Sequence, residues 1–562
     1  MKYSCCLLLL ILFGTSISAQ NYPTKDFVPP MHIPLYLAGV FGECRPTHFH
    51  AGMDIKTNQV EGLPVFSIGD GYVSRIKVSA FGYGNALYIT HTNGYTSVYG
   101  HLQSFRADIA AYVKQKQYEK ETYEIDLELA PNIIICKKDE QVAKSGNTGG
   151  SSGPHLHFEI RDKEENALNP QLFGIKIIDN IAPSISGVAI YNEDMDRFAT
   201  VPIILNTKLK GTYFAPIKDT ILLNSDAIAF GVEAIDRMNN SAGNNGLYEI
   251  QVKIDGQELY HFTMNKFHFD ETRNVLAYID QKIKSVFSRY FQRCHVLPNQ
   301  YFTPQKNNSI NRGIYTIKDE AYHLVSIVVK DFQQNSSEAK FYVRKDYTTT
   351  VFKKLKYTNQ TAFYAAKKYD YKTGEARIII PESALFDTTY VSIQNNSTSF
   401  CSEIYTIGKP MDAFMVPIEI GLKVKNVAPA YYNKCILVEK SSGKTIVCGG
   451  RYEEGYIIGK TKNFGVFSIA IDTTAPRIIP LNISANKVMN AETSIRISMS
   501  DNLSGIKDYD GYIDGKWVLF ENSGNVLKYK FDLPLSHSEH KLEIHVIDER
   551  MNENIYEVRF IY

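Results

Sequence analysis

Two stretches of this chain, far apart in the sequence, carry the same short motifs in the same order. The first begins with DNIAPSI at Asp179 and continues through AIDRMNNSAG, VKIDG and VVKDFQQNSSEAKFYV; the second begins with DTTAPRI at Asp472 and continues through MSDNLSGI, GYIDG and VIDERMNENIYEVRFI. A repeat of this kind indicates two related domains. Short strands, Gly/Asn/Asp turns and an X-Pro entry are typical of immunoglobulin-like β-sandwiches. We therefore predict such sandwiches at residues 176–345 and 472–562.

The remaining tail is also expected to be β-structured. A chain of 562 residues is too long for one hydrophobic core, and its 37 Tyr and 30 Phe, with recurrent Ile, Val and Thr, favour strands. Residues 346–471 contain ARIIIPESALFDTTYVSI and YIIGKTKNFGVFSIAID, which predict a third β-sandwich. The first repeat is longer than the second because of an insertion around Asn265–Arg312. The predicted fold class is mainly β.

The N-terminus, MKYSCCLLLLILFGTSISAQ, has the layout of a secretory signal. Lys2 supplies the positive start, Cys5–Phe13 the apolar stretch and SISA the cleavage site, so we predict a signal peptide at residues 1–19. The apolar run is too short to span a bilayer, and we expect no stable membrane insertion after cleavage. Lys plus Arg total 61 against 60 for Asp plus Glu, so net charge gives no indication of nucleic-acid binding.

Six cysteines follow the signal, and none shows the C-x-x-C spacing of a cysteine zinc site. Cys435 and Cys448 flank ILVEKSSGKTIV, which predicts a hairpin and, in an oxidising compartment, a cross-strand disulfide. The acidic loop DYDGYIDG at Asp508–Gly515 lacks the ligand spacing and closing Glu of an EF-hand. We predict an ordinary turn there.

Residues 20–175 form the first predicted domain. GYVSRIKVS, NALYITHTNG and YTSVYGHL indicate short strands separated by turns. FRADIAAYVKQKQYEKETYE, at Phe105–Glu124, differs because it is rich in Ala, Lys, Gln and Glu and places Ile109, Tyr112 and Val113 on one helical face. We predict a helical insertion at about 105–125, between strands.

Histidines are concentrated in this domain. In SGNTGGSSGPHLHFEIRD, His155 and His157 are two residues apart on an expected strand and must point to the same face. In THFHAGMDIKT, His50 and Asp54 are four apart, and their even spacing puts both on one face in an extended chain. Gly52 would leave space between them for a metal.

A third cluster, SVYGHLQSF, puts His101 at the end of a strand. His50, Asp54 and one histidine of the HLH pair would supply two imidazoles and a carboxylate, which is the three-ligand pattern of catalytic zinc with an open fourth position. The other two histidines would then serve as acid/base and oxyanion-stabilising groups. His48, His91 and Glu159 are expected to have structural or supporting roles.

Together, HFHAGMDI, YGNALYITHTNGYTSVYGHL and SGNTGGSSGPHLHFEI resemble the lysostaphin/LytM-type zinc metalloendopeptidases over residues 35–172. The resemblance implies a small antiparallel β domain with a groove over the sheet. It implies one zinc ion bound by His50, Asp54 and His157, with His101 and His155 at the catalytic positions, without saying which of the two is the base. It also implies peptidoglycan stem peptides or cross-bridges as substrate.

The sequence therefore predicts an exported zinc endopeptidase that cuts peptidoglycan cross-links. A cleaved signal and sandwich additions resemble Gram-negative members of the family, which implies the periplasm and a cut between D-Ala and diaminopimelate. Two features depart from the family: His101 and His155 are 54 residues apart because of the helical insertion, and the long sandwich tail is not a familiar wall-binding module. The tail would position the enzyme, inhibit it or bind an envelope protein partner.

Three alternatives remain open. The first is a non-catalytic adaptor that activates other wall hydrolases, although such members have typically lost zinc ligands. The second is an adhesion or scaffold protein of the envelope in which the sandwiches carry the function. The third is a peptidase whose substrate is a protein rather than the wall.

Overall fold

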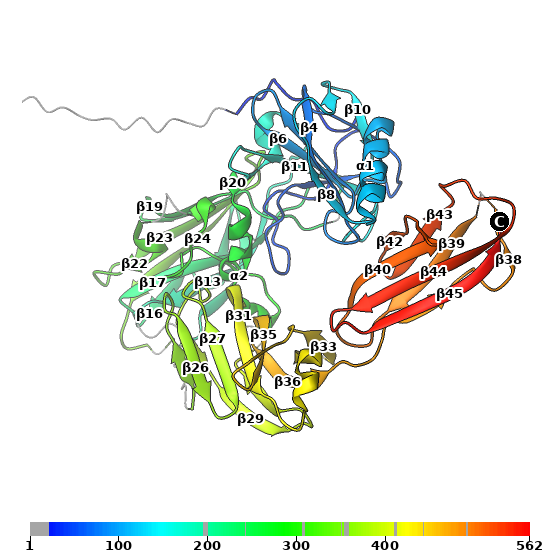
Figure 1. Cartoon of the computed structure of the whole chain (residues 1–562). Helices are drawn as coiled ribbons and strands as arrows, with labels where there is room; N and C mark the ends of the chain where they lie inside the picture. Colours follow the sequence, from blue (N-terminus) through cyan, green and yellow to red (C-terminus); the bar gives the residue numbers. More distant parts are fainter. Residues whose placement is uncertain are drawn as a thin grey trace, which may run out of the picture.

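The protein is described by a computed structural model, which covers residues 22–562 apart from 195–199, 242, 306–309, 350, 353–358, 410–412, 442 and 491–492. The predicted signal peptide, residues 1–19, lies outside the described residues. Figure 1 shows β domains following one another along a curve, so that the last domain comes back to face the first. No helix in the described part of the chain is both long and apolar enough to cross a membrane.

The first domain is built on an antiparallel sheet with the strand order β1-β2-β11-β6-β5-β4-β8. A small second sheet has the order β3-β10-β7, and helix α1 (Ala107–Lys120) follows β7. The strands are β1 (Leu37–Gly39), β2 (Met53–Lys56), β3 (Pro64–Phe66), β4 (Gly71–Val78), β5 (Ala86–His91), β6 (Thr96–Gly100), β7 (Ser104–Phe105), β8 (Ile125–Glu128), β9 (Ile135–Cys136), β10 (Gln141–Lys144), β11 (His155–Arg161) and β12 (Ala167–Leu168).

The central strands of this sheet are buried on both faces, although they carry polar side chains. All five residues of β6 are buried, and on β11 every residue after His155 is buried. The helix α1 turns Ile109, Val113 and Gln117 inward, and the first two join the core of this domain. Within this buried sheet, β2 and β11 are adjacent antiparallel strands, so the side chains that they carry are held in fixed positions.

The second domain is a β domain whose strands are connected in one 11-stranded sheet with the order β19-β18-β23-β24-β15-β14-β13-β17-β21 along its main path. The predicted insertion contains the short helices α2 (Val275–Tyr278) and α3 (Gln281–Phe287). The strands are β13 (Ser184–Asn192), β14 (Ile203–Lys210), β15 (Tyr213–Pro216), β16 (Thr220–Leu223), β17 (Ala227–Ile235), β18 (Glu249–Ile254), β19 (Gln257–Thr263), β20 (Lys266–Phe267), β21 (Gln292–Arg293), β22 (Tyr315–Thr316), β23 (His323–Lys330) and β24 (Ser336–Lys345).

The third domain contains two five-stranded sheets, ordered β26-β27-β31-β35-β34 and β29-β30-β36-β32-β33. Its strands are β25 (Thr361–Phe363), β26 (Tyr369–Thr373), β27 (Ala376–Ile380), β28 (Thr389–Val391), β29 (Ile393–Thr398), β30 (Glu403–Ile407), β31 (Ala413–Lys423), β32 (Cys435–Ser441), β33 (Lys444–Val447), β34 (Arg451–Glu453), β35 (Tyr456–Asn463) and β36 (Gly465–Ile471).

The predicted disulfide in this domain is wrong, because Cys435 and Cys448 are both free thiols. The hairpin exists, but its register is offset from the one that a disulfide needs. The backbone amide of Cys448 donates to the carbonyl of Leu437, so Cys448 lies opposite Leu437. Cys435 instead pairs with Ile471 of β36. Two cysteines that are not cross-strand neighbours fail the geometry of a disulfide.

The last domain has two sheets, ordered β37-β39-β43-β42 and β38-β45-β44-β40-β41. Asp508–Ile513 lies in strand β40, and Asp514 and Gly515 form the turn to β41, as expected for an ordinary hairpin. Its strands are β37 (Arg477–Pro480), β38 (Lys487–Val488), β39 (Ser494–Ser500), β40 (Ile506–Ile513), β41 (Lys516–Trp517), β42 (Glu521–Ser523), β43 (Val526–Lys530), β44 (Glu539–Asp548) and β45 (Glu553–Ile561).

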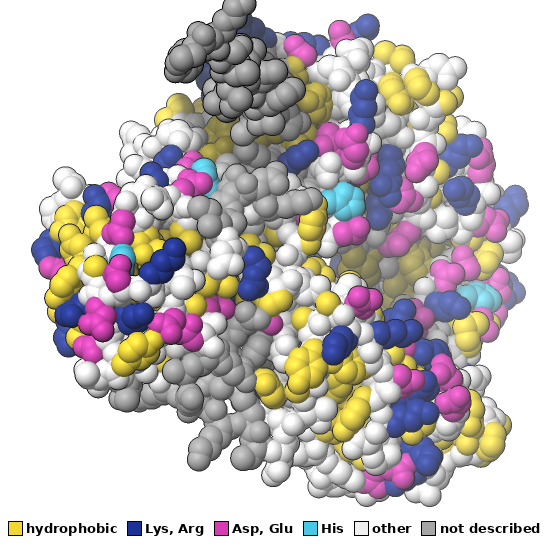
Figure 2. Space-filling view, turned by 90° about the vertical axis from the view of Figure 1, so that its left-hand side faces the viewer, with side chains coloured by type: hydrophobic (Ala, Val, Ile, Leu, Met, Phe, Trp, Pro, Cys, Tyr) yellow, Lys and Arg dark blue, Asp and Glu magenta, His cyan; other side chains and the backbone are white. Residues whose placement is uncertain are grey.

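The first two domains share apolar packing. Phe41, Phe49 and Ala167 of the first domain belong to the core of the second, and β12 pairs with β20 across the boundary. On the face shown in Figure 2, basic and acidic side chains are interspersed. That mixture agrees with the near-zero net charge of the whole chain.

Candidate metal centre

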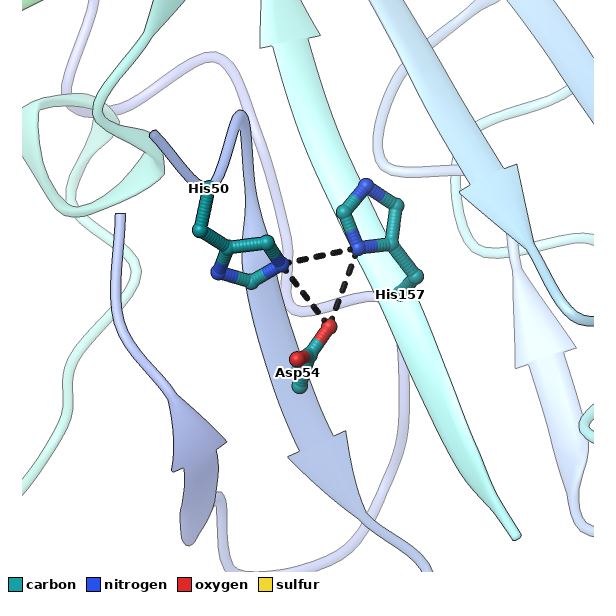
Figure 3. A group of neighbouring side chains, drawn as sticks. All are labelled: His50, Asp54 and His157. Atoms are coloured by element: carbon teal, nitrogen blue, oxygen red, sulfur yellow. Dashed lines mark hydrogen bonds and ion pairs between the residues drawn. The ribbon is translucent and has the colours of Figure 1, made fainter. Parts of the chain in front are cut away.

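The sheet brings His50, Asp54 and His157 together from two neighbouring strands. Asp54 lies on β2 directly opposite His157 of β11, and His50 precedes β2 in the loop that leads into it. Figure 3 shows the three side chains converging on one point. His50 Nε2 is 3.0 Å from Asp54 Oδ1 and 3.1 Å from His157 Nδ1, and His157 Nδ1 is 2.9 Å from Asp54 Oδ1.

These distances suit a zinc ion. Ligands that are about 2.0–2.2 Å from zinc in a tetrahedral arrangement lie about 3.3–3.6 Å from one another. The three donor atoms form a triangle only slightly smaller than that, and all three side chains are buried. Two imidazole nitrogens and one carboxylate oxygen are also ligands that zinc prefers. The residues present therefore fit the metal that the sequence implied.

Hydrogen bonds fix the orientation of both imidazoles. His50 Nδ1 lies 2.9 Å from the carbonyl of Val40, which can only accept, so Nε2 is left without a proton. His157 Nε2 lies 2.8 Å from Glu159 Oε1, which leaves Nδ1 for the metal. A carboxylate behind a histidine ligand sets its tautomer and raises its basicity. Although burial lowers the pKa of His157, hydrogen bonds to Asp54 and Glu159 raise it to about 9, so a metal ion takes the place of the proton on His157 Nδ1. Each ring then presents a lone pair to the centre of the triangle.

Glu159 is fully buried and remains ionised. Burial alone would raise the pKa of Glu159, but Arg161 and hydrogen bonding to His157 outweigh it and hold the pKa at about 2. Arg161 donates to Glu159 Oε2 at 2.8 Å, and the Tyr83 hydroxyl donates to Oε1. Glu159 therefore lies on the side of His157 that faces away from the triangle, where it can orient the ring, as expected for a supporting residue.

Two residues of the centre had no signal in the sequence. Arg45 donates to Asp54 Oδ2 at 2.8 Å, so that the other carboxylate oxygen faces the histidines. The Tyr83 ring stacks on His157 with 5.0 Å between the ring centroids. Neither residue is spaced regularly from the ligands, and only the folded sheet reveals these contacts.

Gly52 has a different role from the one expected. A side chain at this position would meet the carbonyl oxygen of Phe158 at 2.4 Å. Gly52 therefore permits the backbone before β2 to approach β11 closely, and it does not provide space for the metal.

His101 and His155 lie beside the triangle. Their ring centroids are 4.7 Å apart, and His155 Nε2 is 3.5 Å from Asp54 Oδ1. His101 Nδ1 bonds the carbonyl of Thr148 and His155 Nδ1 bonds that of Gly153, both at 2.8 Å. Because a carbonyl only accepts, both Nδ1 atoms carry protons, and the Nε2 atom of each neutral ring is left to accept one.

A groove of about 1080 Å³ opens over this cluster. It is lined by all five histidine and aspartate residues that the sequence singled out, together with His48 on its rim and the segment 150–155. His91 lies elsewhere, buried in the sheet, where its Nε2 is 2.8 Å from Ser97 Oγ. The groove is large enough for an extended peptide.

Comparison with known proteins agrees with this geometry. Residues 48–118 match the model of Peptidase family M23, and residues 360–472 match the model of a Zu5-like domain. The chain therefore carries an M23 peptidase domain, a Zu5-like domain and further β domains. The third domain, predicted only as a sandwich, is the Zu5-like one.

The curated relatives match only this first part of the chain. An uncharacterized metalloprotease of Haemophilus influenzae is 34% identical over 137 residues, which cover 24% of this chain and 23% of the relative. The DD-carboxypeptidase/endopeptidase Mpg of Neisseria meningitidis is 34% identical over 112 residues, 20% of each chain. The peptidoglycan DD-endopeptidase ShyB of Vibrio cholerae is 31% identical over 125 residues, 22% of this chain and 23% of the relative. The chain thus spans about a quarter or less of these relatives.

Proposed function

We propose that this chain is an exported zinc metalloendopeptidase that hydrolyses peptide cross-links of peptidoglycan. The observation that carries the proposal is the buried triangle of His50, Asp54 and His157 under an open groove. The names of two relatives, a DD-carboxypeptidase/endopeptidase and a peptidoglycan DD-endopeptidase, support the substrate class. Export to the periplasm of a Gram-negative cell is part of the proposal and follows from the signal-peptide pattern and the location of such a substrate.

In this proposal His50 Nε2, Asp54 Oδ1 and His157 Nδ1 hold the zinc ion. Zinc in that position supplies a Lewis acid, which activates water and polarises the scissile carbonyl. Arg45 keeps Asp54 turned toward the site, and Glu159 keeps His157 in the tautomer that a ligand needs. The protein's task is to hold these groups in place before substrate arrives.

His101 and His155 handle the protons. The pKa of His101 is lowered to about 4 by burial and by the neighbouring His157 and His155, so the ring is neutral near pH 7. Its Nδ1 proton is tied to Thr148, and Nε2 is the atom that exchanges protons. His155 is held in the same way by Gly153. The pair supplies a proton acceptor for water and a donor for the oxyanion or the leaving amine.

The test combines metal analysis with muropeptide digestion. We expect the full chain to hold one zinc ion and to convert cross-linked muropeptide dimers into monomers. His101→Ala should keep the zinc and lose activity by about 10²–10⁴-fold, because a positioned acid/base group contributes that much. Asp54→Ala should lose both zinc and activity, since it removes a ligand.

His32→Ala is the matched control, because His32 is exposed and pairs with Asp139 outside the groove. It should change neither zinc content nor rate. Full activity in Asp54→Ala would overturn the ligand assignment. A zinc-loaded chain that leaves muropeptide dimers intact but cleaves a protein would move the substrate from wall to protein. A chain that binds no zinc and cuts nothing would favour the adaptor or scaffold role.

A further inference from the structure

Each of the two related sandwiches brings three aspartates together at the end of the domain where its chain begins. In the second domain these are Asp179 before β13, Asp236 after β17 and Asp331 after β23, and carboxylate oxygens of the three lie within 4.8 Å of one another. Asp472, Asp501 and Asp548 form the same kind of group in the last domain. All six belong to the motifs that repeat along the sequence.

The two groups are held by matching hydrogen bonds. Asn335 donates its backbone amide to Asp331 Oδ1 at 2.9 Å and its side-chain amide to Asp331 Oδ2 at 2.6 Å and to the carbonyl of Asp179 at 3.2 Å. Asn552 makes the same three bonds with Asp548 and Asp472, at 2.8, 2.7 and 3.2 Å. Because the same three hydrogen bonds occur in both domains, the arrangement is a property of the repeated domain and not of one copy.

The first group is the more open to a ligand. Asp179, Asp236 and Asp331 are only 8%, 3% and 3% exposed. Asp179 Oδ2 and Asp236 Oδ1 are buried and have no hydrogen-bond partner. In the last domain the corresponding Asp472 Oδ2 accepts from the amide of Ser504, so that group has fewer open oxygens.

Three buried carboxylates in this position have no counter-charge. Among the described residues, no Lys, Arg or His forms an ion pair with Asp179, Asp236 or Asp331. Burial, and then Asp331 and Asp179, raise the pKa of Asp236 to about 8, which reflects the cost of placing these charges together. Unpaired buried carboxylates are strongly unfavourable, and either a bound cation or protonation of one of them relieves the cost.

All three aspartates line a cavity of about 20 Å³, which has room for one ion or water. Oxygen is the donor type that all three aspartates offer, which suits a hard cation and not zinc. Mg²⁺ keeps several of its waters when bound, and so small a cavity does not accommodate them, whereas Ca²⁺ accepts protein oxygens in flexible numbers. We propose that the cluster of Asp179, Asp236 and Asp331 is a calcium site.

The site lies at the boundary of the peptidase domain. Phe41, Asn169 and Gln171 of that domain line the same cavity, and Gln333, two residues after Asp331, donates to Gln171 Oε1 at 2.8 Å. Asp179 stands in the segment that connects the two domains. Calcium there fixes the peptidase domain against the sandwich. This role is independent of the proposed zinc chemistry.

Equilibrium dialysis of the zinc-loaded, full-length chain against radioactive Ca²⁺ tests the site. Asp236→Asn should lower the number of bound calcium ions by one and leave zinc content unchanged. The same variant should melt no lower than wild type without calcium, because it removes repulsion, and should lose the rise in Tm that calcium gives to wild type. A merely structural aspartate would lower Tm in both buffers.

Asp179→Asn provides a second variant with the same expected loss of one ion, in case Asp236→Asn does not fold. Asp508→Asn is the matched control, since Asp508 is exposed on strand β40 of the last domain, and it should bind as much calcium as wild type. The proposal is overturned if wild type binds no calcium at 1 mM, or if both variants bind as many ions as wild type. Displacement by an equal concentration of Mg²⁺ would overturn the choice of calcium.

Discussion

At the scale of single residues, His101 combines an unusual backbone with a proposed catalytic role. Its φ is +58°, a left-handed conformation that costs a histidine free energy. Its amide donates to the carbonyl of Tyr83 at 2.8 Å, and its ring is tied to Thr148. A side chain on Gly146 would meet the His101 carbonyl at 2.8 Å, so a glycine is needed behind it. The surrounding loops thus hold His101 in a strained position beside the metal centre.

His91 shows how burial makes this domain sensitive to acid. Burial lowers the pKa of His91 to about 4, against about 6.5 for an unperturbed histidine. Between these two values the unfolded chain binds the extra proton and the folded chain does not, so stability falls as pH falls through this window. The loss should reach about 2 kcal/mol at pH 5 relative to neutral pH. Hydrogen exchange of β5 and β6, corrected for the intrinsic effect of pH, would measure it.

His91→Gln should reduce this pH dependence by the share that His91 contributes, about 2 kcal/mol, because glutamine keeps a polar group near Ser97 and does not titrate. His32→Gln replaces an exposed histidine and should leave the dependence as in wild type. An equal acid-induced loss of protection in His91→Gln and wild type would show that another group is responsible.

At the scale of elements, the insertion of the second domain packs against the loop that carries the metal ligand His50. Phe49, next to the ligand His50, is fully buried and stacks on Phe302 with 4.7 Å between centroids. Its ring also meets Tyr278 of α2 edge-on, and its amide donates to the carbonyl of Thr272 at 3.0 Å. The loop that carries His50 is therefore positioned by a domain that contributes no ligand.

Phe302→Ala tests this support without touching the site. Removing a buried phenylalanine costs about 3–5 kcal/mol of stability, and the cavity would free Phe49 to shift. We expect zinc affinity to fall about 10–100-fold, as it does when groups that orient a ligand are lost. Competition with a chelator on the full-length chain would measure it. Phe341→Ala is the matched control.

Phe341 is as buried as Phe302 and packs against Phe230, with 6.1 Å between ring centroids. Its removal should therefore cost similar stability while leaving zinc affinity near that of wild type. An equal loss of zinc affinity in both variants would mean that general destabilisation of the sandwich, and not the position of Phe49, controls the metal site.

Local patterns predicted much of the peptidase sheet. The alternation in GYVSRIKVS and NALYITHTNG corresponds to β4 and β5, and spacing two puts His155 and His157 on one face of β11. Local sequence patterns do not predict which distant segments of the chain contact one another. The stacking of Phe49 on Phe302 and the offset register at Cys435 depend on the packing of whole domains, and no spacing in the sequence encodes them.

At the scale of the whole molecule, the last domain contacts the helix of the first. Figure 1 shows α1 facing the last domain. The Tyr118 hydroxyl donates to Asp532 Oδ2 at 2.8 Å, and Lys114 Nζ is also 2.8 Å from that atom. Trp517 packs against Tyr118 edge to face, 5.4 Å between centroids. The helical insertion therefore docks the distal end of the tail onto the peptidase domain.

This contact encloses a cleft of about 520 Å³ beside the groove. Thr148 and Asn147 of the first domain line it opposite Glu521 and Asn522 of the last. Thr148 is also the residue whose carbonyl holds the ring of His101. Thr148 therefore connects this cleft to His101 of the proposed catalytic pair.

Asp532→Ala should loosen this docking. The ion pair with half-exposed Lys114 contributes little, but a hydrogen bond from Tyr118 to a carboxylate contributes about 1.5–3 kcal/mol before screening, so we expect up to about a tenfold shift toward chains in which the last domain is detached from α1. Trp517 is the only tryptophan, and its fluorescence should shift to the red as it meets water, while the radius of gyration from X-ray scattering rises. Glu539→Ala, which removes an exposed pair with Arg559 in the same domain, should change neither. Unchanged fluorescence and size in Asp532→Ala would show that the tail stays docked without this contact.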